Sequence, residues 1–200
     1  MKAYNGFKAE ASSAAPFPML PAGPYVGQIR AVKLDGAEPD QTLILRLEVT
    51  EGPEAGYFTK RYNHDKDAGG SFTPRYKGDL RLRVPNLENA SDQYPQTTLK
   101  RFQDAIFRIE SSNPGYHWDW NEYGLVGKTV GFSMREGTYN DVPYTTVARL
   151  ETADDVRKGL VNPMQPSKPR YSEDYPAAQP AAAPASGPQF TVVETDELPF

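Results

Sequence analysis

The stretch TLILRLEVT, residues 42–50, alternates apolar and polar side chains. Its apolar residues at every second position are Leu43, Leu45, Leu47 and Val49, and Ile44, Arg46 and Glu48 lie between them. Successive side chains of a β-strand point to opposite faces, so this period of two is typical of a strand with one face in a core. The sequence therefore predicts a strand over residues 42–50, and the neighbouring segments are interpreted from it.

The segments on both sides of this strand also have strand character. Upstream, YVGQIRAVKL at residues 25–34 is rich in strand formers and ends at Asp35-Gly36, a turn signal. Downstream, residues 51–56 turn the chain, and YFTKRY at residues 57–62 predicts a third strand in which aromatic and basic residues interleave. Residues 63–79 then predict a long, irregular basic loop, which precedes a short strand with apolar residues Leu80, Leu82 and Val84.

The remaining ordered segments are a helix and two strands. A helix is expected from about Thr97 to the stop signal Asn113-Pro114-Gly115, with Leu99, Phe102, Ile106 and Ile109 at helical spacing. Strands are expected over residues 127–135 and 144–150, followed by a short helical turn at 154–158. Three strands, a helix and two strands is the order of the OB barrel, whose second and third strands bind oligonucleotides. We therefore predict an all-β fold with one short helix, a five-stranded OB-type barrel and a disordered C-terminal tail.

Composition divides the chain into four parts. Residues 1–22 are expected to be flexible, and residues 23–161 form the predicted domain. Residues 162–188 hold seven prolines and six alanines, so this stretch is expected to be a disordered linker. Residues 189–200 form an acidic end. No apolar run approaches the roughly 20 residues of a membrane span, and there is no signal peptide, so we expect a soluble cytoplasmic protein.

The sequence offers little support for catalysis. It has no cysteine and only two histidines without ligand spacing, so neither a metal nor another cofactor is expected. No phosphate-binding glycine loop follows Gly69-Gly70. Asp119 and Glu122 are close in sequence, and an enzyme that uses them with a metal such as Mg²⁺ is a rival interpretation. We expect a protein that is not an enzyme.

Charge is distributed unevenly, which favours a nucleic-acid binder despite the net charge of −4. Residues 56–83 carry seven Lys or Arg against three Asp, whereas residues 171–200 carry five acids and no base. Binding a single strand requires cations along the phosphates and aromatic rings that stack on bases. The predicted DNA-binding residues are Tyr57, Phe58, Lys60, Arg61, Tyr62, Arg75, Tyr76, Lys77, Arg81, Arg83 and Tyr139.

The sequence leaves open which of the rings of Tyr57, Phe58 and Tyr62 face the core, because alternation sends about half of the strand aromatics inward. Tyr76, flanked by charges in a loop, is the better stacking candidate. Trp118 and Trp120 follow the helix in a stretch without Lys or Arg. We expect them to pack the helix onto the barrel rather than to bind bases.

The C-terminus is the most specific feature of the sequence. Three acids, Glu194, Asp196 and Glu197, precede Leu198-Pro199-Phe200. This ending resembles the acidic tip of bacterial single-stranded DNA-binding proteins, a cluster of Asp followed by Ile/Leu-Pro-Phe, although with fewer consecutive acids. The layout of OB domain, low-complexity linker and tip is also similar.

The domain itself resembles phage- or prophage-encoded proteins of Gram-positive hosts, on residues 20–26, 51–56 and 156–159. The two resemblances imply sequence-tolerant binding and protection of single-stranded DNA, in replication, recombination or repair in a bacterial cytoplasm. They also imply that Asp196, Glu197, Leu198, Pro199 and Phe200 recruit replication, recombination or repair proteins. The rival from another class is a small-barrel phage adaptor, a protein-interaction module without DNA binding. The sequence leaves open a monomer, dimer or tetramer.

Overall fold

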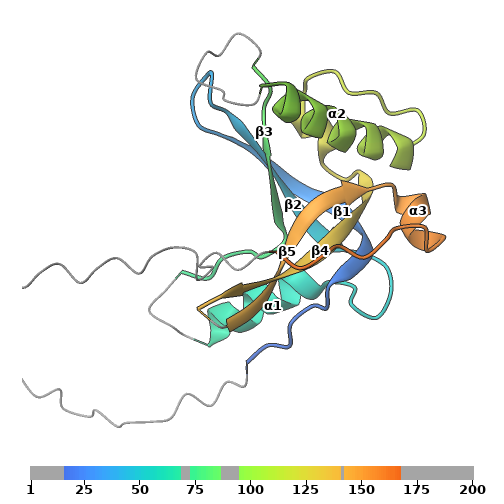
Figure 1. The fold of residues 1–200 in the computed structure, drawn as a ribbon. Helices are drawn as coiled ribbons and strands as arrows, with labels where there is room; N and C mark the ends of the chain where they lie inside the picture. The colour runs from blue at the N-terminus through green and yellow to red at the C-terminus, as the bar shows by residue number, and fades with distance from the viewer. Residues whose placement is uncertain (1–15, 69–72, 87–94, 141, 168–200) are drawn as a thin grey trace, which may run out of the picture. The chain divides into compact units, whose positions relative to one another are not determined.

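The structure is a computed structural model that describes residues 16–68, 73–86, 95–140 and 142–167. Its elements are β1 (Gly23–Asp35), β2 (Thr42–Val49), α1 (Tyr57–Asp67), β3 (Asp79–Arg83), α2 (Pro95–Ser112), a 3-10 helix η1 (Glu122–Leu125), β4 (Thr129–Tyr139), β5 (Val142–Glu151) and α3 (Ala153–Arg157). The five strands form one antiparallel sheet in the order β3-β2-β1-β4-β5 (Figure 1). This mostly β architecture, with a helix between the third and fourth strands, confirms the predicted fold class.

The sheet curls but does not close. Its two edge strands are β3 and β5, and among the described residues no ladder joins them. The central strand β1 pairs along its length with two neighbours: residues 27–35 pair with β2, and residues 23–28 pair with β4. A register shift between Ile29 and Ala31 marks the bend, as expected where one strand passes between two parts of a curved sheet. At Gly27 an added Cβ would lie 2.2 Å from the carbonyl oxygen of Glu48, so only glycine fits where the two strands approach this closely.

The core follows the predicted alternation. Leu43, Leu45, Leu47 and Val49 are at most 2% exposed, and they share one core with Phe102, Ile106 and Ile109 of α2. The predicted helix is therefore confirmed, although it begins at Pro95, two residues before Thr97. The last two strands are longer than predicted and meet in a tight hairpin, and the helical turn after them is α3.

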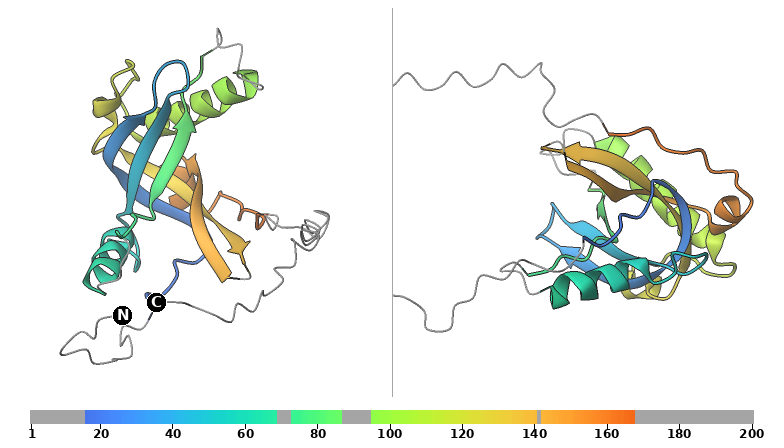
Figure 2. Two further views of the ribbon diagram at one scale, coloured as in Figure 1. Left: turned by 90° about the vertical axis from the view of Figure 1, so that its left-hand side faces the viewer. Right: turned by 90° about the horizontal axis from the view of Figure 1, so that it is seen from below.

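The prediction of a strand over residues 57–62 is wrong, because these residues begin α1. The helix continues to Asp67, so the first part of the predicted loop 63–79 is also helical. Tyr57 and Phe58 are adjacent in sequence yet both buried, at 5% and 1% exposure, which a strand with alternating faces would not allow. α1 and α2 lie at opposite ends of the sheet (Figures 1 and 2).

The N-terminal part of the domain extends further than the sequence indicated. Leu20 is fully buried, its amide donates to the Tyr57 hydroxyl at 2.8 Å, and its carbonyl accepts from Thr145. Packing therefore begins before Gly23, within the segment predicted to be flexible. At the other end, the amide of Ser167 donates to the Glu136 carbonyl at 2.9 Å, inside the predicted linker. Residues 168–200, with most of that linker and the whole tip, lie outside the described residues.

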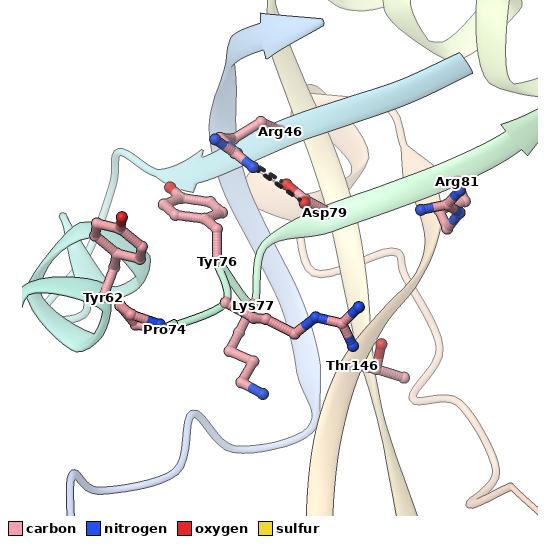
Figure 3. Close-up of a pocket in the computed structure, with 9 residues that line it drawn as sticks. Arg46, Tyr62, Pro74, Tyr76, Lys77, Asp79, Arg81 and Thr146 are labelled. Atoms are coloured by element: carbon pink, nitrogen blue, oxygen red, sulfur yellow. Dashed lines mark hydrogen bonds and ion pairs between the residues drawn. The ribbon is translucent and has the colours of Figure 1, made fainter. Parts of the chain in front are cut away.

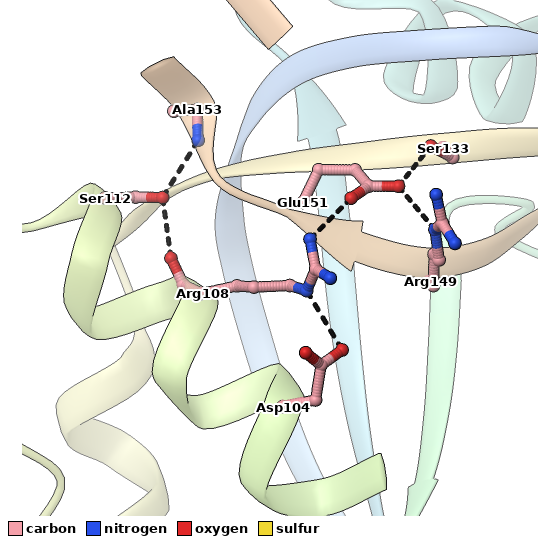
Figure 4. Close-up of polar contacts among 7 residues, drawn as sticks. All are labelled: Asp104, Arg108, Ser112, Ser133, Arg149, Glu151 and Ala153. Atoms are coloured by element: carbon pink, nitrogen blue, oxygen red, sulfur yellow. Dashed lines mark hydrogen bonds and ion pairs between the residues drawn. The ribbon is translucent and has the colours of Figure 1, made fainter. Parts of the chain in front are cut away.

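A buried carboxylate joins α2 to the sheet (Figure 4). Glu151 on β5 is 2% exposed and accepts from Arg108 of α2 at 2.6 Å, from Arg149 at 2.5 Å and from the Ser133 hydroxyl at 2.7 Å. Arg108 also pairs with Asp104 at 2.9 Å. Because every oxygen of this carboxylate has partners, its burial is compatible with a stable fold. Within the described ranges, no helix combines the length and apolar character needed to cross a bilayer.

Candidate functional site

A basic cleft opens beside the free edge of β3. Its walls come from β2, from β3 and residues 74–77 that lead into it, from the middle of α1, and from β5 across the open side of the sheet (Figure 3). It encloses about 770 Å³. The lining residues are Arg46, Tyr62, Pro74, Arg75, Tyr76, Lys77, Asp79, Arg81 and Thr146. Four cationic side chains thus face one carboxylate, with two tyrosine rings among them.

Arg46 is held in place by its neighbours. Its guanidinium donates two bonds to Asp79, at 3.0 and 3.3 Å, across the pair of strands β2 and β3. The hydrogen bond to Asp79 raises the pKa of Arg46, and the guanidinium carbon lies 4.7 Å from the centre of the Tyr76 ring. Arg75 and Lys77 are exposed and form no ion pair within the part of the chain that is described. These two cations give the cleft its unbalanced positive charge.

Tyr76 forms a fixed wall of the cleft. Its hydroxyl lies 3.0 Å from the Leu47 carbonyl oxygen and 3.1 Å from a carboxylate oxygen of Glu48. Burial, reinforced by the nearby Glu48 carboxylate, raises the pKa of Tyr76 well above that of free tyrosine. Its ring lies 6.3 Å from that of Tyr62 and 5.9 Å from that of Phe58. The aromatic surface of the cleft is therefore anchored to the core rather than free to swing.

Glu48 is the residue that connects this wall to α1. Its carboxylate accepts from the amides of Phe58 at 2.9 Å and Thr59 at 2.8 Å, and also from the Thr59 hydroxyl. These amides occupy the first turn of α1, where no intrahelical acceptor exists, and Gly56 has no side chain to cap them. Glu48 is 6% exposed, although the alternation of β2 placed it on the outer face. No local signal indicates this role, because the capping residue belongs to a different element from the helix that it caps.

A second hollow continues the cleft over the outer face of β1 and β2, with Arg46, Asp79 and Arg81 common to both. Here Asp35 pairs with Lys33 at 2.9 Å and with Arg81 at 3.0 Å. Hydrogen bonds from Lys33 and then Arg81 lower the pKa of the Asp35 carboxyl. We call the continuous surface the basic groove. Its members are Lys33, Arg46, Tyr62, Arg75, Tyr76, Lys77 and Arg81, with Asp35 and Asp79 as its carboxylates.

The structure brings together about half of the residues predicted from sequence. Those in the basic groove are Tyr62, Arg75, Tyr76, Lys77 and Arg81. The prediction that Tyr57 and Phe58 bind DNA is wrong, because their rings lie in the core, where neither can contact a ligand. On α1, Lys60 donates to the Ala55 carbonyl at 2.8 Å and Arg61 to the Tyr57 hydroxyl at 3.1 Å, and neither lines the groove.

The two remaining predicted residues of the domain lie outside the groove. Arg83 pairs with Asp40 at 2.6 Å, further along β3, and Tyr139 is 51% exposed at the end of β4. Lys33 and Arg46 were not predicted. Arg46 could have been found, because the alternation of β2 already placed it opposite the core.

The other predicted site is the tip, and Asp196, Glu197, Leu198, Pro199 and Phe200 lie beyond the described residues. Within the described ranges, no three His, Asp or Glu side chains are grouped as metal ligands would be. No model of a known protein family matches the chain, and no curated protein is significantly similar to it.

Proposed function

We propose that this protein binds single-stranded DNA in the basic groove, with little dependence on sequence and without catalysing a reaction. The observation that carries the proposal is the composition of one cleft: four cations and two tyrosine rings, of which that of Tyr76 is anchored, against a single carboxylate. Cations bind phosphates, and flat rings stack on bases of any kind. The groove lies on β2 and β3, the face that OB folds use for oligonucleotides.

The ion pairs of the groove indicate which cations contribute most. Arg46 and Arg81 are already paired with Asp79 and Asp35, so a phosphate gains less from them. Arg75 and Lys77 have no such partner within the described part of the chain, and they should form the principal phosphate contacts. Since binding a phosphate releases counterions, affinity should fall steeply with salt.

The proposal extends to the C-terminus through its sequence. An acidic run that ends in Leu198-Pro199-Phe200 presents an aromatic ring and an α-carboxylate together, which a basic-rimmed apolar pocket can bind. We propose that this tip recruits replication, recombination or repair proteins to the bound strand in a bacterial cytoplasm, for a phage or its host.

The test is titration of the full chain with labelled oligo-dT at low salt, followed by fluorescence anisotropy. We expect saturable binding that weakens as salt is added. Absence of binding at low salt would contradict the proposal and would favour the adaptor interpretation. Turnover of a nucleic-acid substrate with Mg²⁺, lost in Asp119→Ala, would instead favour the enzyme.

A further inference from the structure

An aromatic site lies at the α2 end of the sheet, away from the basic groove. It consists of Phe102, Trp118 and Trp120, which line one small hollow with Leu34, Leu43 and Val84. The rings of Phe102 and Trp120 are nearly parallel, at 11° with centres 6.1 Å apart, and Trp118 lies 6.0 Å from Trp120 at a tilt of 55°. The expectation that the tryptophans pack the helix is confirmed for Trp118, which is half-buried against the core.

Trp120 is positioned differently. It is 67% exposed although it is one of the largest apolar side chains, so the fold does not need its burial. Its backbone has φ of 66°, a left-handed conformation that is uncommon and strained for a bulky residue. One face of its indole is backed by Phe102. A strained loop therefore holds a largely exposed ring against a rigid support, which is the arrangement a stacking platform requires.

A second cleft, also lined by cations, connects the aromatic site to the basic groove. It runs between β3 and the start of α2, and its lining includes Arg81, Arg83, Arg101 and Phe102. Arg81 also lines the basic groove, and Phe102 also lines the aromatic hollow. Arg101 is exposed and forms no ion pair among the residues described. β3 leads from the α1 end of the sheet to the α2 end (Figure 2), so these clefts follow one another along its free edge.

We propose that the aromatic site is a second base-stacking subsite, and that a single strand passes from the basic groove along β3 to Trp120. This inference rests on the proposed function. The absence of Lys and Arg between residues 109 and 127 argued against a nucleic-acid contact in this stretch of sequence. The fold supplies the missing cations from other elements, Arg83 from β3 and Arg101 from α2. Glu122 also lines the hollow, which favours a base there and phosphates on the side of Arg101.

The chain is suited to a direct test, because Trp118 and Trp120 are its only two tryptophans. Intrinsic tryptophan fluorescence therefore reports on the aromatic site alone, while the anisotropy of a labelled oligonucleotide reports on binding anywhere. The probes are oligo-dT of about 16 and about 4 nucleotides, the limits of the usual site size of one OB domain. The variant is Trp120→Asn, because asparagine tolerates the left-handed backbone and removes the ring. Tyr123→Ala is the matched control: Tyr123 is 72% exposed nearby and does not line the hollow.

We expect the longer oligonucleotide to quench the fluorescence of the parent chain. Trp120→Asn should bind it about 5- to 150-fold more weakly, the loss for one stacked base, whereas Tyr123→Ala should bind like the parent. The 4-nucleotide probe should bind the parent and Trp120→Asn alike, because it occupies the basic groove without reaching Trp120. If the long probe binds without quenching and Trp120→Asn binds it as tightly as the parent, this inference is overturned while the proposed function stands. If neither probe binds the parent chain, the proposed function itself fails.

Discussion

The hydroxyl of Tyr76 couples the wall of the groove to Glu48, and its pKa is raised in the folded protein. The unfolded chain releases this proton near pH 10 and the folded protein only at higher pH, so this contribution to stability is complete below pH 10 and declines above it. Tyr76→Phe should therefore lower the free energy of unfolding by about 1 kcal/mol at pH 7, through the lost hydrogen bonds. The difference from the parent should shrink as pH rises above 10. Denaturant melts at pH 7 and pH 10.5 measure it, and a constant difference would contradict the assignment.

Glu48 is the residue on which the first turn of α1 depends. Glu48→Ala leaves the amides of Phe58 and Thr59 without their acceptor and leaves the Tyr76 hydroxyl with the Leu47 carbonyl alone. We expect a loss of about 2–4 kcal/mol in the free energy of unfolding, from the cap and the buried donors. Glu136→Ala, at an exposed position on β4, should change it by less than about 0.5 kcal/mol. Equal effects of the two substitutions in chemical denaturation would contradict the claim that the Glu48 carboxylate stabilises the first turn of α1.

At the scale of elements, α1 shows where sequence reading fails. Tyr57, Phe58 and Tyr62 favour a strand by composition, and an isolated six-residue window contains no helix start signal. The missing signal is Glu48, nine residues before α1 begins at Tyr57, whose carboxylate reaches the helix only after β2 has folded. By contrast, β1, β2 and α2 carry their own periodic patterns and turn signals, and these elements were predicted correctly.

The attachment of α2 to the sheet depends on the Glu151 carboxylate. Arg108→Ala removes the less exposed of the two arginine partners and leaves Arg149 and Ser133 in place. We expect the free energy of unfolding to fall by up to about 3 kcal/mol, because the buried carboxylate then keeps only some of the hydrogen bonds that compensate for its lost solvation. Arg149 is more exposed, so Arg149→Ala should cost less than Arg108→Ala. Thermal melts of the two variants side by side check the order, and a greater loss in Arg149→Ala would contradict it.

At the scale of the whole molecule, the fold class was predictable and the surface was only partly so. Periodicity identified the buried residues, because burial is a local property of each strand or helix. The basic groove draws Lys33 from β1, Arg46 from β2, Tyr62 from α1, and Arg75 and Lys77 from the segment before β3. Such a combination depends on which edges face each other, which no single segment encodes. The predicted binding residues therefore include the groove's Arg75 and Lys77, but also Lys60 and Arg61 of α1, which do not line it.

The described core extends from Leu20 to Ala153, so the domain should fold without the C-terminal residues. A chain ending at Ser167 should melt within a few degrees of the full chain, because it keeps the bond of Ser167 to Glu136. Loss of cooperative melting would show that the removed residues stabilise the domain.

The proposed role of the tip is tested separately. Deletion of Phe200 should abolish the capture of host replication or repair proteins while leaving oligo-dT affinity unchanged, because the ring is lost and the terminal carboxylate moves to Pro199. Capture of the same proteins by the shortened chain would contradict recruitment through Phe200.

The central claim is that Arg75 and Lys77 neutralise phosphates of a bound strand. The most direct measurement is the slope of log affinity for oligo-dT against log salt, for the parent chain, for Arg75→Ala/Lys77→Ala, and for Lys60→Ala as a control outside the groove. Each lost phosphate contact should reduce the magnitude of the slope by about 0.7. We predict that the double variant binds more weakly with a slope smaller by about 1.4, and that Lys60→Ala keeps the parent slope. An unchanged slope in the double variant, or an equal change in Lys60→Ala, would contradict the account.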